Sequence, residues 1–152
     1  MKVETLGDVL DWNRALHQRL AERLARGSEQ ADESLARFLL TYLAEHETTL
    51  EKVVSGFEAR ADPKALRTWV YDFLDNEPVD PHESTDTPFA DMSFDEVCRA
   101  VFGLHNKVIR LYRHLAGRAD TPEVKELVDA LLAMEEHETM QLAQQANRIR
   151  DM

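Results

Sequence analysis

The stretch LHQRLAERLARG at residues 16–27 returns in altered form as LHNKVIRLYRHLAG at residues 104–117. Both stretches open with Leu-His, and both place apolar residues every three or four positions, which is the period of a helix with one buried face. Further along, YLAEHET at 42–48 is matched in the same way by AMEEHET at 133–139. Two matches in the same order indicate a duplicated helical hairpin, and hence a fold built from two such hairpins.

The helical period extends over most of the chain and predicts four long helices. We expect them at about residues 6–27, 32–60, 93–117 and 121–149. Capping signals support the starts of the last two: Ser93 is followed by Glu96 as in a capping box, and Thr121 precedes a proline. The connections near 28–31 and 117–121 are short, so each pair of helices forms an antiparallel hairpin.

A long crossover at about residues 61–92 joins the two hairpins. Its first part, DPKALRTWVYDFL, begins with Asp-Pro and predicts a short extra helix that buries Trp69, Val70 and Phe73. Its second part, DNEPVDPHESTDTPFADM, is rich in proline and acids and predicts irregular structure. We therefore predict an all-α protein, a four-helix bundle in which residues 1–152 form a single domain.

Composition and charge exclude several classes of function. The net charge is -11, from 29 acidic and 18 basic residues, which disfavours binding to nucleic acid or to anionic membranes. The start of the chain has no apolar run of a secretory signal, and no stretch reaches the roughly 20 apolar residues of a membrane span. Cys98 is the single cysteine, so an intramolecular disulfide is excluded. These features predict a soluble cytoplasmic protein.

Polar side chains interrupt the apolar stripe of each predicted helix. The four candidates for the interior are His17, Glu47, His105 and Glu138. On the second helix His46 competes with Glu47 for the inward position, and on the fourth His137 has a weaker claim than Glu138. Asn13 lies one turn before His17 and is placed to orient it.

Buried carboxylates are costly unless a partner compensates them. Either the histidines do so by hydrogen bonding, or a bound cation does. Imidazole together with carboxylate suits first-row transition metals rather than Ca²⁺ or Mg²⁺. The cluster therefore predicts a transition-metal site, with iron preferred and manganese or zinc as alternatives, while a metal-free hydrogen-bonded cluster is the other interpretation.

Three stretches resemble the rubrerythrin-like members of the ferritin-like superfamily. HNKVIRLYRHLAGRA at 105–119 is similar to their third helix, LAEHETTLEKV at 43–53 to their second, and AMEEHETMQLAQQA at 133–146 to their fourth. The resemblance implies a four-helix bundle with a metal centre that handles oxygen or peroxide. It also favours association into a homodimer.

The ligand pattern departs from that family. Its dimetal members carry Glu on two helices and a Glu-x-x-His pair on the other two. Here His17 and His105 stand where the first two Glu would fall, and Leu50 and Gln141 stand where the histidines of the pairs would fall. The alternative function is therefore a non-enzymatic bundle that has lost its metal and acts as an interaction or stress-related scaffold. The sequence indicates no substrate and no separate acid or base.

Overall fold

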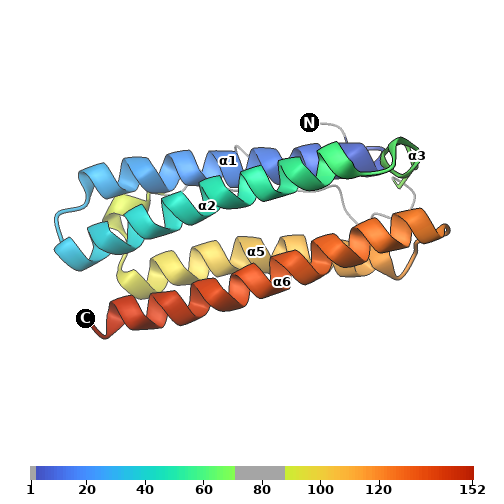
Figure 1. Ribbon diagram of the computed structural model, residues 1–152. Coiled ribbons are helices and arrows are strands. Elements are labelled where there is room, and N and C mark those ends of the chain that lie inside the picture. Colours follow the sequence, from blue (N-terminus) through green and yellow to red (C-terminus); the bar gives the residue numbers. More distant parts are fainter. Residues whose placement is uncertain (1–2, 71–87) are drawn as a thin grey trace.

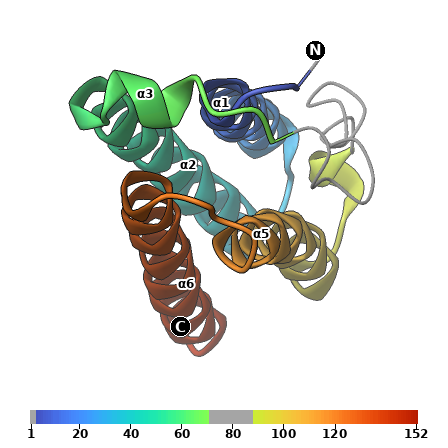
Figure 2. The same ribbon diagram turned by 90° about the vertical axis from the view of Figure 1, so that its right-hand side faces the viewer.

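The computed structural model describes residues 3–70 and 88–152. Its long helices are α1 (Leu6–Gln30), α2 (Ser34–Arg60), α5 (Phe94–Ala116) and α6 (Pro122–Arg150). They form two antiparallel hairpins, α1 with α2 and α5 with α6 (Figure 1). Viewed from the end, the hairpins pack into a bundle in which α2 lies beside α6 (Figure 2). The predicted all-α bundle is confirmed.

Side-chain caps fix the starts of three long helices. The predicted capping box at Ser93 and Glu96 is present at the start of α5. Thr121 caps α6 by accepting a hydrogen bond from the backbone N–H of Val124. A further capping box at the start of α1, formed by Thr5 with Asp8, is not among the sequence predictions. These caps satisfy backbone donors that the first turn of a helix leaves unpaired.

Parts of the predicted crossover form short helices, α3 (Pro63–Leu66) and η2 (Phe89–Asp91). The predicted extra helix is thus present as α3, although it spans only 4 residues. Val70 is buried as expected, but Trp69 is 49% exposed, which corrects the expectation that it is buried. Residues 71–87 lie outside the described residues, and with them Phe73 and most of the predicted irregular segment.

The apolar core consists of two clusters, and the buried polar residues lie mainly between them. On α1, for example, His17 falls between Leu16 of one cluster and Leu20 of the other.

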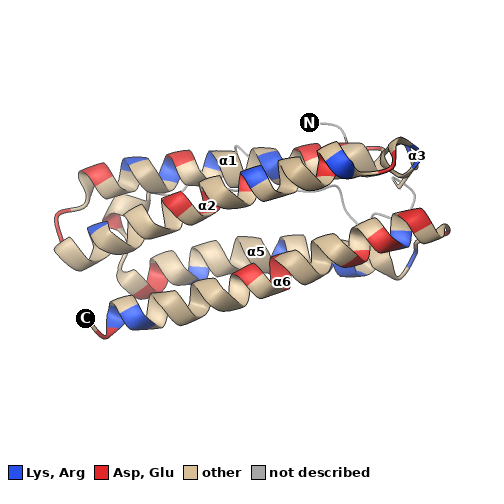
Figure 3. Ribbon diagram, viewed as in Figure 1, with Lys and Arg blue, Asp and Glu red and all other residues tan. Residues whose placement is uncertain are grey.

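Lys, Arg, Asp and Glu are interspersed along the helices on the side seen in Figure 3. Within the described ranges, no helix combines the length and apolar character that crossing a membrane requires.

The buried face of α6 differs from the predicted one. The sequence predicts a stripe of Leu127, Leu131, Met134, Glu138, Leu142, Gln145 and Ile149. Of these, Leu131, Leu142 and Ile149 are buried, and the other buried residues of the helix are Val124, Val128, Glu135 and Ala146. The buried face therefore overlaps the predicted one but is displaced around the helix from it. As a consequence Glu135, and not Glu138, faces the interior.

Candidate metal centre

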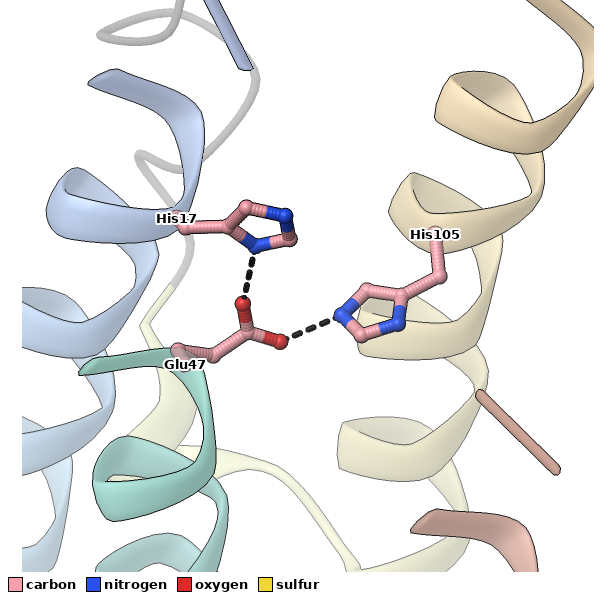
Figure 4. Close-up of side chains that lie close together, drawn as sticks. All are labelled: His17, Glu47 and His105. Atoms are coloured by element: carbon pink, nitrogen blue, oxygen red, sulfur yellow. Dashed lines mark hydrogen bonds and ion pairs between the residues drawn. The ribbon is translucent and has the colours of Figure 1, made fainter. Parts of the chain in front are cut away.

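Three ligand-type side chains from three helices meet in the middle of the bundle (Figure 4). These are His17 of α1, Glu47 of α2 and His105 of α5, all with at most 1% of their surface exposed. Each offers one ligand atom, and these atoms all lie within 4.8 Å of one another. Glu47 lies between the two rings: its Oε2 is 2.5 Å from Nδ1 of His17, and its Oε1 accepts a hydrogen bond from Nε2 of His105.

Helix α6 holds the opposite side of each imidazole ring. Nε2 of His17 lies 3.1 Å from Oε1 of Glu135, and Nδ1 of His105 lies 3.0 Å from Oγ1 of Thr139. Each ring therefore has Glu47 on one side and a group from α6 on the other. Such bonds fix the orientation of both rings toward Glu47. All four long helices contribute to this arrangement.

Asn13 extends the network to Tyr112. Its Nδ2 donates to Oε1 of Glu135 at 3.0 Å and to the hydroxyl of Tyr112 at 2.6 Å. Asn13 is thus linked to His17 indirectly, through the hydrogen bond that it donates to Glu135. Two buried oxygens here, Oδ1 of Asn13 and Oε2 of Glu135, have no hydrogen-bond partner among the described residues. Such atoms are costly unless water or an ion compensates them.

Burial and neighbouring charges shift the pKa values of His17, Glu47 and Glu135. Burial is the largest single influence on His17 and by itself lowers its pKa, but Glu135 and Glu47 together outweigh it and raise the pKa from 6.5 to about 10. Burial raises the pKa of Glu47, yet His105 and His17 bring it well below its ordinary 4.5. Burial raises the pKa of Glu135, but His17, with smaller effects of His105 and Asn13, brings it below its ordinary value. Without a metal, His17 is an imidazolium between two carboxylates.

The other sequence candidates lie outside this group. The prediction that Glu138 faces the interior is wrong, because its side chain is 26% exposed and lies between α2 and α6. There its Oε2 is 3.6 Å from Nε2 of His46, whose own side chain is 12% exposed. The ring of Tyr42 stacks on His46 with centroids 6.3 Å apart. His137 is on an exposed face of α6.

Sequence reasoning missed Glu135 and Thr139, which contact the histidines from α6. A signal for Glu135 exists in the sequence. The line through Val124, Val128, Leu131, Glu135, Thr139, Leu142, Ala146 and Ile149 is apolar except at Glu135 and Thr139. It is therefore as good a candidate for the buried stripe as the predicted line, whose polar positions are Glu138 and Gln145.

Two helical hairpins connected by a long crossover, with imidazole and carboxylate groups at the centre, are the architecture of the ferritin-like fold. A solved structure supports this class: the chain matches a protein of Thermotoga maritima described as a ferritin-like diiron-carboxylate protein, with a TM-score of 0.59 and 16% sequence identity. The match covers 94% of this chain and 95% of that chain. No family model matches the sequence, and no curated protein matches it significantly. The fold is ferritin-like.

The centre differs from the dimetal arrangement of this fold. That arrangement takes Glu from two helices and Glu-x-x-His from the other two. In this chain α2 carries Glu47-x-x-Leu50, α6 carries Glu135-x-x-Glu138, and α1 and α5 each supply a histidine. The described residues contain one compact group of three potential ligands. Three ligand side chains, His17, Glu47 and His105, suit one metal ion better than two.

Proposed function

We propose that this chain binds one first-row transition-metal ion through His17, Glu47 and His105. The observation that carries the proposal is the convergence of three fully buried ligand side chains, with ligand atoms within 4.8 Å of one another. Two histidines and one carboxylate are the ligand set of non-haem Fe(II) oxygenases, and the same donors also suit manganese, cobalt and zinc. Iron is the preferred ion, in keeping with the diiron description of the structural neighbour.

The surroundings of the three residues fit an ion. A metal-bound histidine usually gives its second ring N–H to a carboxylate, hydroxyl or carbonyl, and Glu135 and Thr139 occupy those positions here. Oε2 of Glu135 is buried and has no hydrogen-bond partner in the part of the chain that the structure describes, so it adds a negative group that an ion would compensate. The residues present therefore match the needs of a bound cation.

The bound ion would supply redox chemistry toward oxygen or peroxide. The chain itself would hold the ion in a site enclosed by the two apolar clusters, which limit access of water. Ligation requires that the proton on Nδ1 of His17 leaves, while the proton on Nε2 stays in the hydrogen bond to Glu135. Glu135 thus fixes the ring nitrogen that is presented to the metal.

A metal-free scaffold is the second candidate function, and one observation favours it. Every ring nitrogen of His17 and His105 already has a protein partner. In that case the cluster is a buried hydrogen-bonded network of imidazole and carboxylate groups. The bundle would then serve as an interaction or stress-related protein.

Metal analysis separates the two functions. Protein purified without chelators or an affinity tag would be loaded anaerobically with Fe(II), Mn(II), Co(II) or Zn(II), and its metal content measured after gel filtration. Our proposal predicts about one equivalent of metal per chain. Less than about a tenth of an equivalent of every ion would support the scaffold instead. Faster consumption of oxygen or peroxide by the iron-loaded protein than by free Fe(II) would support the redox role.

A further inference from the structure

A second pair of ligand-type side chains lies between α2 and α6, outside the buried centre. Nε2 of His46 and Oε2 of Glu138 are 3.6 Å apart, which is longer than a hydrogen bond. Nε2 of His46 is itself buried and has no hydrogen-bond partner among the described residues. The stacked ring of Tyr42 restricts the orientation of the imidazole. His46 is thus held beside Glu138 while its buried Nε2 has no hydrogen-bond partner among the described residues.

The separation of the two atoms suits a shared cation. Metal–nitrogen and metal–oxygen bonds of about 2.0–2.2 Å place two ligand atoms of one ion roughly 3.4–3.6 Å apart at angles near tetrahedral or trigonal. The observed 3.6 Å between His46 and Glu138 agrees with this spacing. Two protein ligands leave the remaining positions to water, so binding there would be weak and exchange fast.

The pair lies between solvent and the buried centre. His46 directly precedes Glu47, and Glu138 follows Glu135 by one helical turn. The inner carboxylates are fully buried, whereas the side chains of His46 and Glu138 are 12% and 26% exposed. The same two helices therefore present an outer and an inner layer of ligand groups.

We propose that His46 and Glu138 form a transfer site that receives a divalent transition-metal ion from solvent and passes it to the inner centre. This inference rests on the proposed function, since it requires His17, Glu47 and His105 to hold the ion finally. The outer site accelerates loading and contributes little to the amount of metal bound at equilibrium.

The rate of loading tests the transfer site. Apo protein would be mixed with Co(II) in a stopped-flow instrument, and the cobalt absorption followed for wild type, His46→Gln and Glu138→Gln. We expect both variants to reach the wild-type final content and spectrum, but at rates lower by at least about tenfold, more than the removal of one steering charge explains. Glu136→Gln and His137→Gln on the exposed face of α6 are matched controls, with expected rates within about twofold of wild type.

Each outcome leads to a distinct conclusion. If wild type takes up no metal, the proposed function fails and the transfer site with it. If wild type loads but His46→Gln and Glu138→Gln load at its rate, the transfer site is refuted and the inner centre stands. A lower final content in either variant, with unchanged circular dichroism, would also refute it, because the pair would then belong to the resident site.

Discussion

Oε1 of Glu135 lies 3.1 Å from Nε2 of His17, on the side of the ring opposite Glu47. Helix α6 therefore contributes a group that orients a histidine, where the repeat in the sequence suggested a ligand equivalent to Glu47. In the EHET stretch at 45–48, Glu47 faces the interior. In the EHET stretch at 136–139, the residue that contacts a histidine is Thr139. The matched stretches of α2 and α6 therefore present different positions of the repeat to the interior.

The variant Glu47→Gln tests the centre most directly. Glu47 contacts both histidines, and its charge is the one that a cation between them would neutralise. We expect Glu47→Gln to bind less than about a tenth of the metal that wild type binds, while the helical circular dichroism is kept. His105→Gln removes a different ligand and should give the same loss. Wild-type metal content in both variants would show that these residues are not ligands.

Glu135→Gln tests the orienting role. Gln still fills the position but no longer offers a carboxylate to Nε2 of His17, so the ring is held less firmly and is less basic. Loss of such an outer partner typically lowers metal affinity about 10–100-fold. Competition with a chromophoric chelator would measure this change, and Glu136→Gln, exposed on the same helix, is the control. Equal affinities for Glu135→Gln and wild type would exclude the role.

The stability of the metal-free protein should fall as the pH rises above about 6.5, and it should also fall in acid. The pKa of His17 is raised from 6.5 to about 10, so its stabilisation is fully present below pH 6.5 and is lost as the pH rises toward 10. The pKa values of Glu47 and Glu135 are lowered from 4.5, so their stabilisation is present above pH 4.5 and is lost in acid. Urea denaturation should therefore show maximal stability between these limits. In His17→Gln the decline on the alkaline side should be much smaller, and an equal decline would contradict the assignment to His17.

Metal affinity should change with pH in the opposite direction. The ion competes with the proton on Nδ1 of His17, so binding releases a proton and strengthens as the pH rises toward about 10. Up to a tenfold gain per pH unit is expected from one displaced proton, about 1.4 kcal/mol. Titrations with Zn(II) in buffers of different ionisation enthalpy would count the protons released. Affinity independent of pH would contradict ligation by His17.

The fold and three residues of the site could be predicted from the sequence, because the interior stripes of α1 and α5 are clear and that of α2 leaves a choice between Glu47 and His46. On α6 two overlapping lines are both largely apolar, since Leu127 and Met134 flank the true stripe and are themselves partly buried. Periodicity cannot choose between such lines; packing against the other helices does. Likewise the bond between Asn13 and Tyr112 joins residues 99 positions apart and has no local signal. If Glu138 were an interior ligand, as the sequence predicts, Glu138→Ala would abolish metal uptake, whereas the proposed transfer site predicts slower loading.

The packing of the crossover against α1 yields a prediction that is independent of metal. A Cβ added at Gly27 would lie 2.9 Å from Cβ of Phe89, whose side chain is buried in the core. Gly27→Ala must therefore displace η2, and we expect it to lower the free energy of unfolding by about 1–3 kcal/mol. Gly103→Ala is the matched control, because a Cβ there meets nothing within 4 Å and the helix gains about 0.5–1 kcal/mol from alanine. Chemical denaturation of both variants would measure the difference; if Gly27→Ala is as stable as Gly103→Ala, then η2 does not pack on α1 in solution as it does here.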